Sequence, residues 1–169
     1  VDCNGLGTRV EMDPERVVPD ESLSLDQGAI KPWGADVSSK TGWSHGFRGQ
    51  ILAQLGIDPD LPWRRLPRRQ RELLLHGAGE RSFRVRWSGK TGKGHFDVSF
   101  EGVLPRLMRR FMQTSSERGK RWYGQWLGEA RCRSCRGARL RPESASVRVS
   151  GATLVEVSGL IVDEAGRFF

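Results

Sequence analysis

Cysteines are few and long apolar runs are missing from this sequence. Three cysteines in 169 residues are too few for the disulfide framework of a secreted scaffold. No stretch approaches the roughly 18–20 apolar residues that a membrane-spanning helix needs. Residues 1–5 have neither the charge nor the apolar run of a signal peptide, and there is no initiator methionine. We therefore expect a fragment of a larger protein, with no membrane contact.

Residue patterns that would indicate an enzyme are also missing. Gly89-Lys90-Thr91 resembles the end of a phosphate-binding loop, but that motif needs a glycine where this sequence has Arg84. The segment also leads into a strand-like pattern, whereas a phosphate-binding loop leads into a helix. His45, His76 and His95 have no nucleophile or carboxylate at a motif spacing. The sequence predicts no enzymatic activity for this fragment.

Positive charge is concentrated in the middle of the chain. The whole sequence carries 28 Lys and Arg against 20 Asp and Glu, a formal charge of +8. Residues 63–141 alone carry a net +15, whereas residues 1–62 carry −5 and residues 142–169 carry −2. A segment this basic repels itself unless it meets a polyanion, usually nucleic acid. A solvated basic surface, or a contact with an acidic neighbouring domain, would account for the same charge.

Hydrophobic periodicity predicts an α+β fold, in which helices pack with a small antiparallel β-hairpin. The expected elements outside the hairpin are a strand at Thr8–Met12, helices at Trp43–Leu55 and Glu101–Gln113, a helical region at Leu61–Leu75 broken at Pro67, a helix at Ser116–Leu127, a strand at Ser146–Val149, and short helices at Thr153–Ser158 and Val162–Phe169. Along 101–113 the apolar residues share one side, and the arginines project from the other. Trp87, Trp122 and Trp126 are expected to face the core.

Residues 83–100 show the clearest local pattern, that of an antiparallel hairpin. Apolar side chains at 83, 85 and 87 alternate with arginines, and those at 96, 98 and 100 alternate with polar residues. Pairing Phe83 with Phe100 places all six apolar side chains on one face. The connecting loop, residues 89–94, would then carry Lys90 and Lys93 at its tip.

The cysteines suggest a metal site. Cys132 and Cys135 form a Cys-x-x-Cys-x-Gly knuckle, whose spacing lets two thiolates converge on one metal. Cys3-Asn4-Gly5 repeats the Cys-x-Gly ending, so Cys3, Cys132 and Cys135 are predicted to be three thiolates of a structural zinc site. The fourth ligand would be a cysteine just before Val1. A thioredoxin-type redox pair at 132–135, or three unrelated buried cysteines, are the alternatives.

Several segments resemble UvrA, the damage-sensing subunit of bacterial nucleotide excision repair. The segment Cys132–Glu143 reads C-x-x-C-x-G-x-R-L-R-P-E, and Cys3–Gly7 reads C-x-G-L-G. Further segments that fit this family are Ser22–Leu25, Gly28–Ile30, Pro32-Trp33, Phe100–Pro105 with Arg109-Arg110, Val162–Ala165 and Phe168-Phe169. Residues 34–95 fit less well, and Gln113–Gly119 and Arg133 depart from the family pattern.

The resemblance implies a domain organisation and a function. Residues 1–12 would be half of a first zinc knuckle of a signature domain, residues 13–128 an insertion or DNA-binding domain, and residues 129–169 the second knuckle and the return into the signature domain. The whole protein would be a cytoplasmic, dimeric ABC-type ATPase of the excinuclease. It would bind ATP outside these residues and hand damaged double-stranded DNA to UvrB.

The basic segment supplies the expected DNA contacts. Contacts of this kind hold phosphates and read no base sequence, as a damage scanner requires. The predicted contact residues are Arg84, Arg86, Lys90, Lys93, Arg106, Arg109, Arg110, Arg118, Lys120 and Arg121. The alternative function is a protein-interaction module, in which the same face docks an acidic partner or a neighbouring domain.

Overall fold

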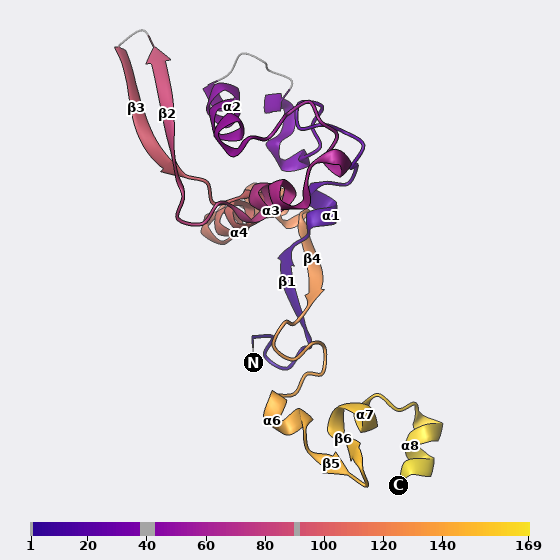
Figure 1. Ribbon diagram of the computed structural model, residues 1–169. Helices are drawn as coiled ribbons and strands as arrows, with labels where there is room; N and C mark the ends of the chain where they lie inside the picture. Colours follow the sequence, from indigo (N-terminus) through magenta and orange to yellow (C-terminus); the bar gives the residue numbers. More distant parts are fainter. Residues whose placement is uncertain (1, 38–42, 90–91) are drawn as a thin grey trace. The chain divides into compact units, whose positions relative to one another are not determined.

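The computed structural model describes residues 2–37, 43–89 and 92–169 (Figure 1). The chain divides into two compact units: residues 12–127, and a terminal unit made of residues 1–11 and 128–169. Short helices and two-stranded sheets make up both units, which confirms the α+β class. Among the helices in the described ranges, none has both the length and the apolar character of a membrane span.

Helices dominate the 12–127 unit, and one hairpin accompanies them. In chain order its elements are α1 (Pro14–Val17), the 3-10 helix η1 (Lys31–Val37), α2 (Trp43–Leu55), the 3-10 helix η2 (Trp63–Arg65), α3 (Arg68–His76), β2 (Ser82–Gly89), β3 (Gly92–Ser99), α4 (Val103–Gln113) and α5 (Glu117–Gly124). The predicted bounds of α2 are confirmed. The predicted break at Pro67 separates η2 from α3, because proline fixes its own φ and disfavours a helical residue before it.

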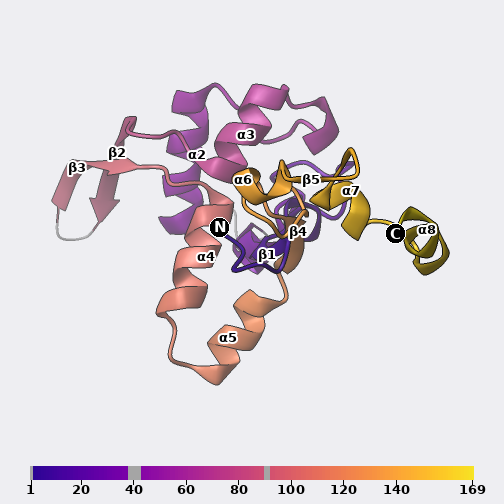
Figure 2. The same cartoon turned by 90° about the horizontal axis from the view of Figure 1, so that it is seen from below.

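The core of this unit joins its N-terminal segment to α3 and α4. Val17, Ala29 and Leu74 are completely buried there. Leu104 and Leu107 of α4 enter the same core, which confirms the amphipathic pattern predicted for this helix. Helix α5 returns beside α4 (Figure 2). The arginines of α4 therefore project from an element that a buried apolar face holds in place.

Two glycines let the backbone pass itself where α3 ends and α4 begins. Gly77 caps α3 with φ +94°, and Gly102 precedes α4 with φ +86°. A Cβ atom on Gly102 would lie 2.3 Å from the Gly77 nitrogen. Next to this contact, the Ala78 N–H donates a hydrogen bond to the Phe100 carbonyl (2.9 Å). Only glycine can adopt this φ and also approach another backbone so closely. The contact between Gly77 and Gly102 therefore determines where α4 starts.

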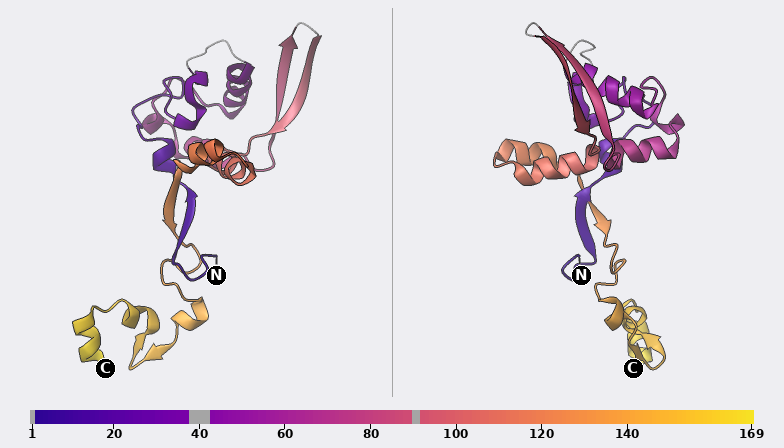
Figure 3. Two further views of the ribbon diagram at one scale, coloured as in Figure 1. Left: turned by 180° about the vertical axis from the view of Figure 1, so that it is seen from behind. Right: turned by 60° about the vertical axis from the view of Figure 1, so that its left-hand side comes forward.

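The hairpin is present, but its predicted register is wrong by two residues. Strands β2 and β3 form a long antiparallel ribbon that projects beyond the neighbouring helices (Figure 3). Phe83 pairs with Val98 rather than with Phe100, and Gly89 pairs with Gly92. The connection is therefore two residues long, where a six-residue loop was expected. A shift of two keeps every side chain on its predicted face, so the alternating pattern could not detect it.

Only part of the hairpin's apolar face is buried. Phe83 and Val85 are 1% and 2% exposed and pack with Ile51 of α2. Farther along the ribbon, Trp87 is 39% exposed and Phe96 38%. The prediction that Trp87 faces the core is wrong: its cross-strand partner is Gly94, and its side chain belongs to neither hydrophobic core cluster of this unit.

The other tryptophans of this unit also include both exposed and buried side chains. Trp122, which was also expected in the core, is 43% exposed. Helix α5 ends at Gly124, earlier than predicted, so Trp126 packs against the core while Trp122 remains near the surface. Trp63 is 3% exposed and belongs to the core.

The terminal unit contains two small sheets. Its elements are β1 (Thr8–Met12), β4 (Leu127–Arg131), α6 (Pro142–Ala145), β5 (Arg148–Val149), β6 (Ala152–Thr153), α7 (Leu154–Ser158) and α8 (Val162–Phe168). Strand β1 has the predicted bounds and pairs with β4, which the sequence pattern had not indicated. Helix α7 begins with a capping box, in which Thr153 and Glu156 satisfy each other's backbone amides.

Candidate metal centre and basic face

The two Cys-x-Gly segments have the same backbone geometry. After Cys3, Asn4 and Gly5 adopt φ +50° and +84°; after Cys135, Arg136 and Gly137 adopt φ +50° and +90°. Positive φ in two successive residues turns the chain tightly around the sulfur, and glycine accepts it without strain. The structure therefore confirms that the sequence repeat is also a structural repeat.

Backbone hydrogen bonds hold the two knuckles together. The Cys132 N–H donates to the Gly7 carbonyl (2.9 Å), directly after β4 ends. Within each knuckle the chain closes on itself: Leu6 N–H donates to the Cys3 carbonyl (2.9 Å), and Ala138 N–H to the Cys135 carbonyl (2.8 Å). Residues separated by about 130 positions in the sequence thus form one site in the terminal unit.

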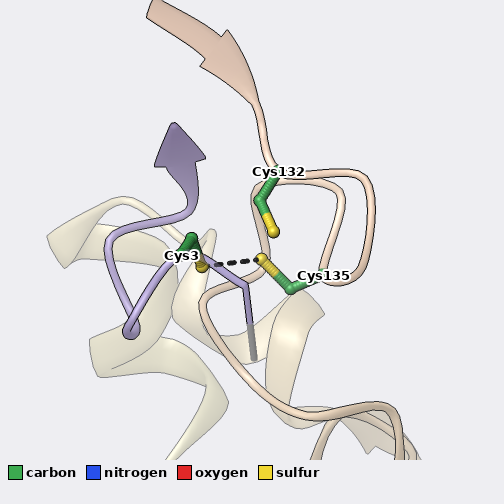
Figure 4. A group of neighbouring side chains, drawn as sticks. All are labelled: Cys3, Cys132 and Cys135. Carbon is green, nitrogen blue, oxygen red and sulfur yellow. Dashed lines mark hydrogen bonds between the residues drawn. The ribbon is translucent and has the colours of Figure 1, made fainter. Parts of the chain in front are cut away.

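The three sulfur atoms converge (Figure 4). All lie within 4.8 Å of one another, and the Cys3 and Cys135 sulfurs are 3.6 Å apart. Two thiolates on a tetrahedral zinc, each about 2.3 Å from the metal, would be about 3.8 Å apart, whereas a disulfide requires about 2.05 Å. The thiols are free and at most 7% exposed. Their number, spacing and burial fit a structural zinc ion.

The surroundings already favour a thiolate at one position. Burial opposes ionisation of Cys3, but the Gly7 N–H, 3.3 Å from its sulfur, and the neighbouring thiols lower its pKa to about 7. Burial raises the pKa of Cys135. The structure therefore favours a thiolate at Cys3 over one at Cys135.

The predicted DNA-contacting residues lie on two parts of the 12–127 unit. Arg84, Arg86 and Lys93 come from the hairpin, and the other described residues come from α4 and α5. Every described member of the set is exposed. Lys90, at the hairpin turn, lies outside the described residues.

Acidic partners neutralise some of these cations, which the sequence pattern did not reveal. Arg84 contacts Asp97 across the hairpin (3.1 Å), and Arg109 contacts Glu101. Hydrogen bonds from these arginines are the main cause that lowers the pKa of both carboxyl groups. Lys120 pairs with Glu117 (3.8 Å). A correct hairpin register would have indicated the first pair, since Arg84 and Asp97 are direct cross-strand neighbours.

Other cations of the set have no acidic partner within 4.0 Å in the described part of the chain. They are Arg86, Lys93, Arg106, Arg110, Arg118 and Arg121. Exposed and unpaired, these side chains can reach the phosphates of a nucleic acid without first breaking an ion pair. We call the nine described residues of the predicted set the basic face.

Comparisons with known proteins point to one family. The model of the UvrA DNA-binding domain matches residues 13–125. UvrABC system protein A of Listeria monocytogenes serotype 4b (strain F2365) is 34% identical over 172 residues, which cover 99% of this chain and 17% of that protein. UvrABC system protein A of Mycobacterium bovis (strain ATCC BAA-935 / AF2122/97) is 39% identical over 155 residues, covering 89% of this chain and 15% of that protein.

A solved structure agrees with the sequence relatives. The crystal structure of UvrA2 from Deinococcus radiodurans superposes with a TM-score of 0.74 at 26% identity, covering 99% of this chain and 21% of that one. The chain thus spans about a sixth of the length of the curated relatives. With two thirds of its residues matched by the family model, this chain belongs to the UvrA DNA-binding domain family.

Proposed function

We propose that this chain binds duplex DNA through its basic face. The observation that carries the proposal is that the segment matched by the DNA-binding family model is also the one that presents the unpaired cations. Arginine and lysine side chains that contact phosphates release condensed counterions, so binding depends steeply on salt and little on base sequence. A protein that searches for damage in any sequence needs this kind of contact.

We propose that zinc holds the terminal unit together. Cys3, Cys132 and Cys135 would be three of its ligands, and the fourth would come from a residue beyond those described. The ion would neutralise the buried thiolates and cross-link segments distant in the sequence. Its role would be structural, because the described ligands are all cysteines, the donor type typical of structural zinc sites.

The relatives' name extends the proposal to the whole protein. We propose that this chain is part of a protein that recognises damaged DNA for nucleotide excision repair in the cytoplasm. It would act as an ABC-type ATPase and a homodimer, with UvrB and UvrC as partners. The ATP-binding motifs would lie outside these 169 residues.

Salt-dependent binding of a non-specific duplex tests the DNA contacts. Replacing Lys93, Arg106 and Arg110 together by Gln should lower affinity. It should also reduce the slope of log K against log salt by about 1 for each phosphate that the variant no longer binds. The matched control replaces Arg64, Arg65 and Arg69, equally exposed and without salt bridges among the described residues, but outside the basic face.

The comparison of these two triple variants decides between phosphate binding and net charge. The control variant should keep a slope within about 0.5 of the unmodified protein. Equal slopes in both variants would show that only the net charge determines binding. This result would refute the proposal that the basic face contacts the phosphates. Displacement of an acidic protein partner, with no duplex binding at moderate salt, would favour the alternative of a protein-docking module.

A further inference from the structure

The 12–127 unit contains a cavity of about 490 Å³ whose aromatic wall takes no part in the proposed phosphate contacts. It lies among η1, α2, the segment after β3, and helices α4 and α5. Its volume is within the range of small-molecule sites, roughly 300–1,000 Å³. The position matters because the same α4 supplies part of the basic face.

Aromatic side chains make up much of the cavity wall. Trp33, Phe47, Phe100, Trp122 and Tyr123 line it. The rings of Trp122 and Tyr123 meet edge to face, 4.8 Å between centroids. Trp122 is 43% exposed although it is among the largest apolar side chains in the unit. An exposed indole beside an aromatic-lined cavity provides a surface on which a planar ring can stack.

Cations lie beside the rings. Arg106 and Arg110 line the cavity from successive turns of α4, and neither has an acidic partner within 4.0 Å among the residues described. Arg48 lies over the Trp33 ring at 5.1 Å. Among the described residues of the wall, Glu101 is the acidic one, and Arg109 already binds its carboxylate. The cavity is therefore aromatic inside and positively charged at its wall.

From this combination we infer that the cavity binds an unpaired nucleobase of a DNA strand, with the adjacent phosphate on Arg106 and Arg110. Stacking on aromatic rings beside cationic side chains is how proteins hold single-stranded nucleic acid without reading its sequence. A base inside a duplex is stacked on both faces, so only an extruded or unpaired base could enter. An aromatic side chain of a protein would fill the cavity but bring no anion to the arginines.

The inference rests on the proposed DNA binding and adds a preference to it. The protein should bind a duplex with one unpaired adenine about five-fold or more tighter than the same duplex fully paired, at one fixed salt concentration. Such a factor corresponds to the lower end of measured stacking energies for one base.

Trp122→Ala should bring the ratio of the two affinities close to one. Trp87→Ala is its matched control, because Trp87 is 39% exposed, comparable to Trp122, but lies on the hairpin and outside the cavity wall. This control should keep the preference.

Arginine variants test the phosphate position. Arg110→Gln should reduce the preference for the unpaired base. Arg121→Gln removes the same charge from an exposed position outside the cavity wall, and should weaken binding of both duplexes by the same factor. Fluorescence anisotropy of labelled duplexes gives all the affinities.

The outcomes separate this inference from the function on which it rests. Equal affinity of the unmodified protein for the two duplexes would overturn the inference and leave DNA binding intact. So would a preference that survives Trp122→Ala, or one that Trp87→Ala removes equally. Failure to bind either duplex would overturn the proposed function itself.

Discussion

Replacing Gly102 by Ala should destabilise the 12–127 unit because two penalties combine at one position. At φ +86° and ψ 164°, a region that essentially only glycine occupies, an L-residue costs about 1–3 kcal/mol. Its Cβ, 2.3 Å from the Gly77 nitrogen, forces the backbones of α3 and α4 apart, which costs about 1–3 kcal/mol more. Alanine also restricts the unfolded chain more than glycine does, which stabilises the folded state by about 0.4–1 kcal/mol. The net loss in the free energy of unfolding should be about 1–5 kcal/mol.

Substitutions at two further glycines of the unit distinguish the conformational cost from the steric cost. Gly56 has φ +67°, and a Cβ atom added there would have no neighbour within 4 Å, so Gly56→Ala should cost only the conformational 1–2 kcal/mol or so. Gly49 is inside α2 with open space around it, so Gly49→Ala should stabilise by up to about 1 kcal/mol. The three substitutions add the same methyl group, which makes them a matched series.

Urea unfolding followed by tryptophan fluorescence measures this series. All six tryptophans lie between residues 12 and 127, so the signal reports on this unit. The midpoint should fall furthest for Gly102→Ala at an unchanged m-value. A Gly102→Ala midpoint equal to that of Gly56→Ala would refute the close approach of the two backbones.

Three further predictions concern the metal, an ion pair and the hairpin. Cys132→Ser or Cys135→Ser should abolish stoichiometric zinc in the purified protein, and full metal occupancy of both variants would contradict the site. Because Arg109 lowers the pKa of Glu101, their ion pair should stabilise the fold above pH about 4.5, and this stabilisation should be lost as the pH falls. Arg109→Gln should flatten the dependence of the free energy of unfolding on pH in this range. An unchanged dependence would count against the ion pair. Phe83→Ala should cost about 3–5 kcal/mol in urea unfolding, whereas a cost below about 1 would mean that the hairpin base is not packed on α2.

Local sequence patterns were sufficient to predict some of the elements and the cysteine cluster. Helix α2 and strand β1 have the predicted bounds, because turn residues and periodicity act over a few positions. The repeated Cys-x-Gly ending predicted that Cys3 would join the pair at 132 and 135, since each knuckle is a local turn with its own geometry.

Tertiary contacts decided the features on which the functional proposals depend. The register of the hairpin depends on its turn, because shifts of two residues leave the alternating pattern unchanged. Whether Trp87 and Trp122 are buried depends on which elements cover them after folding, which no local pattern encodes. Which arginines are neutralised depends on partners brought near by folding.

Composition, charge and short motifs are properties of the chain, so they were enough to predict the α+β class, the basic central segment and the meeting of Cys3 with Cys132 and Cys135. Only the tertiary structure placed Trp33, Trp122 and Arg110 around one cavity. Those residues are separated by up to 89 positions, and packing of α4 and α5 on a common core brings them together.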